Sequence, residues 1–311
     1  MGATEPESRS TGGAPTALAR RPNAHTVLVA LRPRQWVKNV LVFAAPASAG
    51  VLVHASAALR ALAAAAIFVA ASSATYLVND VVDAPADRLH PLKRQRPVAS
   101  GALSPAVALG VAAALLALAL AGAVLLALPL LLVVVAYIAV TFGYSLAMKR
   151  VPVVELAFVS AGFVLRAAAG GAAARVAISP WFLIVTSCLA LFVVAGKRSA
   201  ELSTLGASRG EHRASLASYT PEFLRSVRLL VASVAVTSYC LWVFQRADRI
   251  HGHHLAWFEI SVIPFVLAVL SVEHAIESGR GGEPEELALH DRMLQALGLC
   301  WSLAFALGVY R

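Results

Sequence analysis

Residues 58–97 read ALRALAAAAIFVAASSATYLVNDVVDAPADRLHPLKRQRP, and this stretch decides both the fold class and the place of the chemistry. Its first part, 58–78, is almost entirely apolar, and an α-helix needs roughly 20 such residues to cross a bilayer. Charged side chains follow at once, at Asp80, Asp83, Asp87, Lys93, Arg94 and Arg96. An apolar span that ends in carboxylates and cations predicts a transmembrane helix with a polar site at one membrane face.

The rest of the chain has the same character. Of its 311 residues, 59% are hydrophobic and 14% are charged, and the mean hydropathy is +0.74. These values exclude an ordinary soluble domain. We expect an all-α, polytopic membrane helix bundle of about nine transmembrane helices. The predicted spans are 39–54, 58–78, 104–127, 129–147, 153–173, 180–196, 227–245, 257–272 and 293–310. The division of 104–147 around Pro129 is left open.

The amino-terminal segment differs from the spans. It is polar and rich in Gly, Pro, Ser and Thr, and it lacks the apolar core of a cleavable signal peptide. We expect residues 1–25 to form a disordered cytoplasmic tail. Residues 26–311 are expected to form the transmembrane catalytic domain, with cytoplasmic cap loops at about 80–103 and 197–226.

Lysine and arginine are distributed unevenly between the two ends of the spans. A cytoplasmic amino terminus puts the basic loops at 88–96, 149–150 and 197–228 on the inner side, as the positive-inside rule requires. The expected location is the plasma (inner) membrane, with the polar site facing the cytoplasm. Membrane lipids are the expected partners of the basic surface, and no nucleic-acid partner is expected.

The carboxylates Asp80, Asp83 and Asp87 fall at i, i+3 and i+7, so on a helix they share one face. Three repelling carboxylates at a membrane boundary are hard to explain without a cation. Hard oxygen ligands suit Mg²⁺, which is commonly held by one or two carboxylates plus substrate phosphates. The alternative is a solvated helix end with ordinary salt bridges. Pro85 interrupts helical hydrogen bonding, which leaves the direction of Asp87 open.

Cations near the same face are candidates for binding phosphate. Lys93, Arg94 and Arg96 lie beside prolines that stiffen the loop, and lysine and arginine are the side chains that bind phosphate oxygens. An ordinary positive-inside loop is the alternative. Arg34 and Lys38, one helical turn apart at the start of the first span, could face the same site.

Further charged and polar side chains lie at the ends of later spans. Tyr144, Lys149 and Glu155 flank the loop after the fourth span. Arg166 lies on the same helix face as Glu155 and about 16 Å deeper, at about 1.5 Å per residue. A charge at such depth usually faces a polar cavity. Snorkelling or pairing with a buried carboxylate are the alternatives.

Lys197, Arg198 and Glu201 follow the sixth predicted span. Lys197 and Glu201 are one turn apart, so they form either an ordinary helix-surface ion pair or a second ledge of cation and carboxylate. The histidines at 251, 253 and 254 lie on the predicted outer side without a nearby carboxylate, so we expect a solvated loop there. The acidic run at 283–286 receives no role.

At these residues the sequence resembles the UbiA prenyltransferase superfamily. The first aspartate-rich motif of that superfamily, Asn-Asp-x-x-Asp-x-x-x-Asp, is matched at Asn79, Asp80, Asp83 and Asp87. Members that act on aromatic acceptors usually carry a second aspartate-rich motif, and here its expected region offers Lys-Arg-x-x-Glu at 197–201. The chain is more similar to the actinobacterial decaprenyl-phosphate phosphoribosyltransferases. That resemblance is carried by blocks at 32–42, 76–81, 90–97, 153–155, 194–202, 218–220 and 282–285.

The resemblance implies a reaction and its ligands. The donor would be 5-phosphoribosyl diphosphate (PRPP), the acceptor a long polyprenyl phosphate such as decaprenyl phosphate, and the cofactor Mg²⁺. Diphosphate would leave with inversion at the anomeric carbon, and the product would lead to the arabinose donor of cell-wall arabinan.

The same resemblance gives roles to the candidate residues. Asp80, Asp83 and Asp87, beside Asn79, would hold Mg²⁺, and Lys93, Arg94 and Arg96 would grip phosphates. The 5-phosphate and lipid-phosphate contacts would come from Arg34, Lys38, Lys149, Arg166, Lys197 and Arg198. Tyr144, Glu155 and Glu201 would bind ribose hydroxyls or orient those cations.

Two other functions fit parts of the sequence. A UbiA-type prenyltransferase would move a prenyl group from prenyl diphosphate to an aromatic or lipid acceptor, but no second strong aspartate motif is found. A transporter also has many spans with internal charges, but here the charges gather at one face without an evident internal repeat. Small residues in the spans are compatible with a homo-oligomer but mark no interface.

Overall fold

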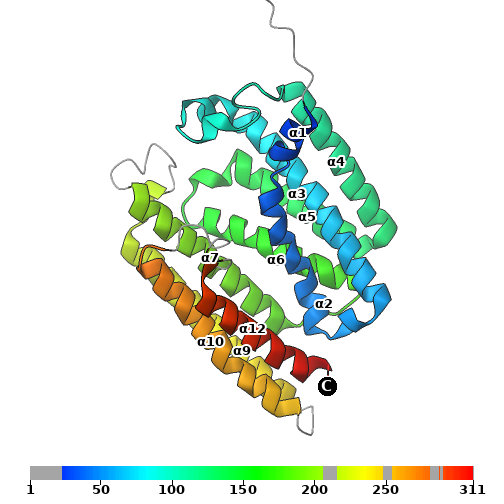
Figure 1. The fold of residues 1–311 in the computed structure, drawn as a ribbon, viewed down its shortest axis with the longest axis vertical. Helices are drawn as coiled ribbons and strands as arrows, with labels where there is room; N and C mark the ends of the chain where they lie inside the picture. Colours follow the sequence, from blue (N-terminus) through cyan, green and yellow to red (C-terminus); the bar gives the residue numbers. More distant parts are fainter. Residues whose placement is uncertain (1–22, 206–215, 248–253, 281–286, 288–289, 311) are drawn as a thin grey trace, which may run out of the picture.

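The computed structural model describes residues 23–205, 216–247, 254–280, 287 and 290–310, and every element in these residues is helical (Figure 1). The prediction of an all-α chain is confirmed. The histidines at 251 and 253, the acidic run at 283–286 and nearly all of the predicted tail lie outside the described residues.

The chain forms two groups of helices. The first group contains α1 (Ala24–Ala30), η1 (Pro33–Phe43), α2 (Ala44–Ser48), η2 (Val51–Val53), α3 (Ala55–Leu89), η3 (Lys93–Gln95), α4 (Pro105–Leu126), α5 (Leu128–Leu146), η4 (Met148–Arg150) and α6 (Val154–Ala174). The second contains α7 (Pro180–Leu205), η6 (Leu216–Ser218), α9 (Pro221–Ala247), α10 (His254–Glu277) and α12 (Arg292–Tyr310). Helices α6 and α7 lie between the rest of the two groups and pack against each other (Figure 1).

Eight described helices are long and apolar enough to cross a membrane, namely α3, α4, α5, α6, α7, α9, α10 and α12. The chain is therefore a multi-pass membrane protein, in agreement with the predicted bundle. The first predicted span, 39–54, is built differently. It is divided among η1, α2 and η2, and Gly50 adopts a positive φ of 74° between the last two.

Several helix ends differ from the predicted spans. Helix α3 continues through Pro85 to Leu89, so all three motif aspartates lie on it. Helix α7 continues to Leu205, so parts of both predicted cap loops are helical. Ala127 is extended between α4 and α5, and Pro129 lies in the first turn of α5, which confirms a division of 104–147 at Pro129.

The broken first segment is held against α3 and α6. Trp36 Nε1 donates to Ser73 Oγ of α3 at 3.1 Å, and therefore acts within the protein instead of as the interfacial anchor that tryptophan often provides. A methyl group on Gly170 of α6 would lie 1.6 Å from the carbonyl oxygen of Val42. Only glycine permits this approach of two backbones. These contacts fix the height of η1, whose polar residues belong to the site described next.

Candidate active site

Two of the three motif carboxylates are buried and share one arginine. Asp80, which is 2% exposed, accepts a hydrogen bond from Arg32 at the start of η1. Arg96 Nη1 donates to Asp87 Oδ2 at 2.7 Å and lies 3.4 Å from Asp80 Oδ1. Asp87 therefore points toward Asp80 even though Pro85 lies between them. Arg96 turns the loop after α3 back onto the helix.

Arg32 was not among the predicted site residues. Its φ is 55°, a left-handed conformation that is uncommon for a residue with a side chain. The guanidinium lies 5.0 Å from the centroid of the Tyr76 ring and contacts Asp80, so packing and charge both hold it in place. Pro33 in the first turn of η1 was the available signal, because proline favours that position and leaves the preceding residue outside the helix. Arg34, which the sequence pointed to, is exposed.

The third carboxylate is the most open. The Asp83 side chain is 39% exposed and accepts a hydrogen bond from Lys149 Nζ at 2.9 Å. One turn earlier on the same face, Asn79 Oδ1 is buried and has no hydrogen-bond partner among the described residues. A buried oxygen acceptor beside carboxylates is a donor set that suits Mg²⁺.

Among the described residues, no three Asp, Glu, His or Cys side chains converge into a complete metal site. Mg²⁺ is commonly held by one or two carboxylates, with substrate phosphates and waters completing its coordination. Asn79, Asp80 and Asp83 are the residues that fit this role best. Asp87, which is bound to Arg96, is better placed to orient that arginine.

The predicted phosphate clamp is only partly turned toward the carboxylates. His90 Nδ1 accepts hydrogen bonds from the backbone N–H groups of Leu92 and Lys93, at 3.2 and 3.3 Å, and so shapes the turn. Arg96 contacts the carboxylates, Lys93 is half-buried, and Arg94 is exposed.

A second ion-pair group joins α6 to α7. Glu155 is fully buried and accepts from Arg198 Nε at 2.9 Å, while Arg198 Nη1 donates to Glu201 Oε2 at 2.6 Å. The carboxylate of Glu201 is therefore bound by Arg198. Lys197, which precedes Arg198 on α7 and was the expected helix neighbour of Glu201, is half-buried. Arg198 thus holds two carboxylates together at the polar end of the bundle.

The segment between η6 and α9 contacts the start of α6 beside this ion-pair group. Tyr219 is buried, and its hydroxyl accepts a hydrogen bond from the N–H of Val153 at 2.8 Å. Val153 has a φ of 65°, which is strained for a β-branched residue. Burial raises the pKa of the Tyr219 hydroxyl, and the nearby Glu155 carboxylate raises it further. Tyr144 is half-buried and acts electrostatically on Arg198.

Arg166 lies deeper, as predicted, and is 5% exposed. Its Nη1 donates to the carbonyl oxygen of Gly162 at 2.7 Å, which turns the guanidinium back toward the end of α6 that carries Glu155. Lys38 lies on η1, which packs against α6. Its Nζ lies 5.7 Å from the centroid of the Phe163 ring of α6.

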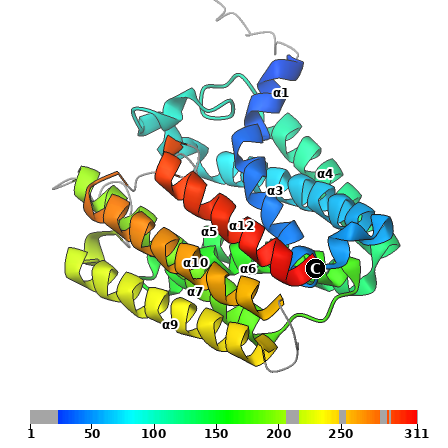
Figure 2. The ribbon, with the colours of Figure 1, turned by 60° about the horizontal axis from the view of Figure 1, so that its bottom comes forward.

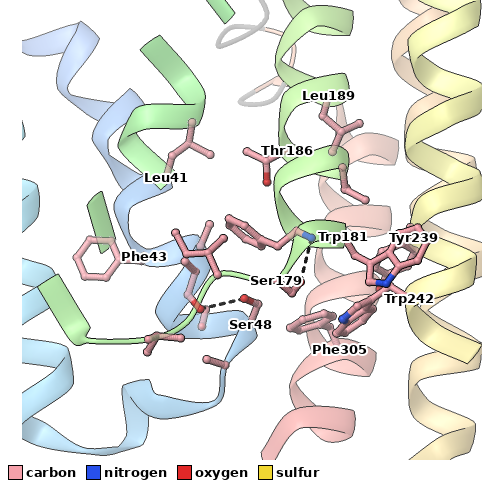
Figure 3. Close-up of a pocket in the computed structure, with 18 of the residues that line it drawn as sticks. Leu41, Phe43, Ser48, Ser179, Trp181, Thr186, Leu189, Tyr239, Trp242 and Phe305 are labelled. Carbon is pink, nitrogen blue, oxygen red and sulfur yellow. Dashed lines mark hydrogen bonds between the residues drawn. The ribbon is translucent and has the colours of Figure 1, made fainter. Parts of the chain in front are cut away.

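A large apolar cavity begins beside these polar residues. Its volume is about 780 Å³, and Val40, Phe163 and Val193 are among the residues that line it. Figure 3 shows Leu41, Phe43 and Ser48 across the cavity from the aromatic side chains of α7, α9 and α12. Because Phe163 both lines the cavity and contacts Lys38, the apolar space adjoins the polar site.

The other end of the cavity is bounded by the last turns of α12. Tyr310 and Phe305 line the wall there. In Figure 2 the end of α12 lies close to α2, and a methyl group on Gly50 would lie 2.8 Å from Val309 Cγ1. Hydropathy does not predict the position of this cavity, because residues that face a cavity and residues that face lipid are equally apolar.

Comparisons with known proteins agree with this architecture. Residues 40–278 match the UbiA prenyltransferase family. The chain is 42% identical over 292 residues to a decaprenyl-phosphate phosphoribosyltransferase of Corynebacterium glutamicum, covering 92% of this chain and 87% of that protein. It is 45% identical over 279 residues to the Mycobacterium tuberculosis protein of the same name, covering 88% of this chain and 91% of that protein.

Solved structures show the same fold. A UbiA homolog from Archaeoglobus fulgidus bound to DMAPP and Mg²⁺ superposes with a TM-score of 0.70 at 18% identity, covering 91% of this chain and 97% of that one. The helix bundle, the aspartate motif and the match over most of the length lead to one assignment. The chain belongs to the UbiA prenyltransferase family.

Proposed function

We propose that the protein transfers the 5-phosphoribosyl group of PRPP to a long polyprenyl phosphate and releases diphosphate. The observation that carries this proposal is the junction of two environments. Paired carboxylates and cations lie at one end of the bundle, and an apolar cavity of about 780 Å³ reaches Phe163, whose ring contacts Lys38 of η1. The relatives named decaprenyl-phosphate phosphoribosyltransferase support the choice of substrates.

The donor diphosphate would lie over the motif end of α3. Asn79, Asp80 and Asp83 would hold Mg²⁺, which stabilises negative charge on the departing diphosphate. A UbiA homolog solved with DMAPP and Mg²⁺ supports a divalent metal in this fold. Arg32, Arg96 and Lys149, now paired with the motif carboxylates, are within reach to bind phosphate oxygens instead.

The acceptor would enter from the membrane. Its prenyl tail would occupy the apolar cavity, with the phosphate beside Lys38 where the cavity meets the polar residues. An acceptor phosphate oxygen is already ionised near neutral pH, so no general base is required. This oxygen would form a bond to the anomeric carbon as the bond to diphosphate breaks. Attack opposite the leaving group gives inversion, and catalysis rests on positioning and charge stabilisation.

The proposed location follows from the same residues. Arg32, Arg96, Lys149 and Arg198 gather at one end of the bundle, and the positive-inside rule puts such an end in the cytoplasm. PRPP is a water-soluble donor, so it would reach the site from that side. The product would then supply the pathway to the arabinose donor of cell-wall arabinan.

Purified protein in detergent should be incubated with PRPP, MgCl₂ and a polyprenyl phosphate, with or without EDTA. The lipid products should be identified by mass spectrometry. The expected product is polyprenyl-phosphoryl-5-phosphoribose, and EDTA should abolish it. Turnover of a prenyl diphosphate with an aromatic acceptor, in the absence of phosphoribosyl transfer, would reject this function in favour of a prenyltransferase.

Arg32 and Arg34 give a test of which basic residue serves the site. Arg32→Met should lower kcat/KM for PRPP by about 10²-fold, the size of effect when one donor to developing negative charge is removed. Arg34→Met, two residues away and exposed, should leave kcat/KM within about twofold, as for a surface substitution. Steady-state kinetics on both proteins make the comparison. Equal losses in the two variants would contradict the role assigned to Arg32.

A further inference from the structure

The Arg166 guanidinium is a buried charge, and its contacts among the described residues are all with neutral groups. Its Nε donates to Asn39 Oδ1 at 2.9 Å, its Nη1 to Gly162 O at 2.7 Å, and its Nη2 to the Tyr137 hydroxyl at 2.9 Å. It also lies 4.8 Å from the centroid of the Tyr137 ring. Of the arginines in the described part of the chain that are less than 9% exposed, Arg198 and Arg228 pair with glutamates, whereas Arg166 pairs with no carboxylate.

Hydrogen-bond donors remain unused at the same place. The guanidinium has more N–H groups than its three side-chain and backbone contacts occupy. Asn39 is 2% exposed, its Oδ1 is bound by Arg166, and its Nδ2 is buried without a partner in the protein. A buried amide nitrogen without a partner is unfavourable, and so is an uncompensated charge within a membrane domain. The positive charge of Arg166 and the unused N–H donors of both side chains together favour binding of an anion.

The position of this pair points to the substrates. Asn39 directly precedes Val40, and Gly162 directly precedes Phe163, and both of those neighbours line the apolar cavity. The guanidinium is directed toward the end of α6 at which Glu155 binds Arg198. Two groups that the guanidinium binds therefore lie next in sequence to the cavity wall, and the guanidinium is turned toward the Glu155 end of α6.

The geometry points to a phosphate monoester subsite formed by Arg166 and Asn39. A phosphate monoester carries close to two negative charges near neutral pH and offers oxygens to several donors. The inference rests on the proposed function, in which both substrates carry such a group: PRPP has its 5-phosphate, and the acceptor has its lipid phosphate. The subsite would be separate from the carboxylates that hold Mg²⁺ and the diphosphate.

Asn39→Asp tests the subsite without removing a side chain. The new carboxylate keeps an oxygen for Arg166 Nε, supplies the missing counter-charge and removes the spare amide donors. A purely structural role predicts unchanged or higher thermal stability and unchanged ligand binding. A phosphate subsite predicts the same stability together with a loss in affinity of about 10- to 100-fold for one phosphate monoester, from the charged hydrogen bonds lost.

Calorimetric titration should use three probes on detergent-purified protein: ribose 5-phosphate, farnesyl phosphate, and inorganic diphosphate with Mg²⁺. Loss of ribose 5-phosphate binding in Asn39→Asp would assign the subsite to the donor, and loss of farnesyl phosphate binding would assign it to the acceptor. Binding of Mg²⁺-diphosphate should stay within about twofold in either case, as for a substitution away from that ligand.

Arg166→Met should reproduce the loss, and Arg60→Met is its matched control. Arg60 also donates to backbone carbonyls, of Leu126 and Ala173, but it lies near the opposite end of α3 and should bind all three probes normally. Unchanged monoester binding in both Asn39→Asp and Arg166→Met would overturn the subsite. Equal loss of all three probes would also overturn it. Absence of phosphoribosyl transfer by the wild-type protein in the mass-spectrometric product assay would instead count against the proposed function.

Discussion

Asp83→Asn is expected to reduce phosphoribosyl transfer by at least about 10³-fold, the upper range for the loss of one group that stabilises developing charge. The carboxylate lies on α3 one turn after Asn79, whose Oδ1 has no partner in the protein, and it is the most exposed of the motif aspartates. The amide retains the size of the side chain but loses the negative charge that holds Mg²⁺. Product formation should be measured by mass spectrometry over a range of MgCl₂ concentrations.

Glu222→Gln is the matched control for Asp83→Asn. Glu222 is an exposed carboxylate in the first turn of α9, so its neutralisation changes net charge equally without touching the motif end of α3. Activity of Glu222→Gln should stay within about twofold of the wild type. Full activity of Asp83→Asn at ordinary Mg²⁺ concentrations would contradict the metal role and leave the pairing with Lys149 as its only observed contact.

Gly170→Ala should strongly destabilise the folded protein. The added methyl group would lie 1.6 Å from Val42 O and 3.0 Å from Pro46 Cδ, so the backbone of the first segment must move away from α6. Overpacking that cannot be relieved by a side-chain rotation belongs to the largest single-residue effects, and we expect a loss of about 3 kcal/mol or more. Thermal unfolding in detergent measures the change.

Gly110→Ala provides the comparison for Gly170→Ala. Gly110 lies inside α4, and a methyl group there would meet nothing within 4 Å. Replacing a glycine in a helix interior by alanine is expected to be neutral or to stabilise by up to about 1 kcal/mol. If both variants unfold at the same temperature, the close approach of η1 and α6 is wrong. Displaced η1 would also misplace Arg32 and Asn39, so activity should fall together with stability.

The parts of the fold and site that sequence could predict depend on local spacing. Hydropathy marks each long helix because crossing a bilayer requires a continuous apolar run. The i, i+3 and i+7 spacing placed the motif aspartates on one face, and the structure shows all three on α3. The depth of Arg166 followed in the same way from the rise of an α-helix.

The parts that sequence could not predict depend on contacts between distant segments. Arg32 meets Asp80 across 48 positions of sequence, Arg198 meets Glu155 across 43, and Lys149 meets Asp83 across 66. Pro33 marks Arg32 as the residue before the helix, but no local pattern shows that Asp80 is its partner. The broken first segment was also read as one span, because apolar composition does not reveal the Gly50 turn or the backbone contact at Gly170.

The pairing of each motif carboxylate with a cation has a thermodynamic consequence. Under the proposed function, Asp80 and Asp83 would bind a metal less strongly while Arg32 and Lys149 neutralise them, and those cations would bind phosphate less strongly while they hold carboxylates. A metal ion and a diphosphate that arrive together would exchange these partners, so that the metal faces the carboxylates and the diphosphate faces the cations. Under the proposed function, metal and diphosphate would therefore be reciprocal effectors, each raising the affinity of the protein for the other by the same factor.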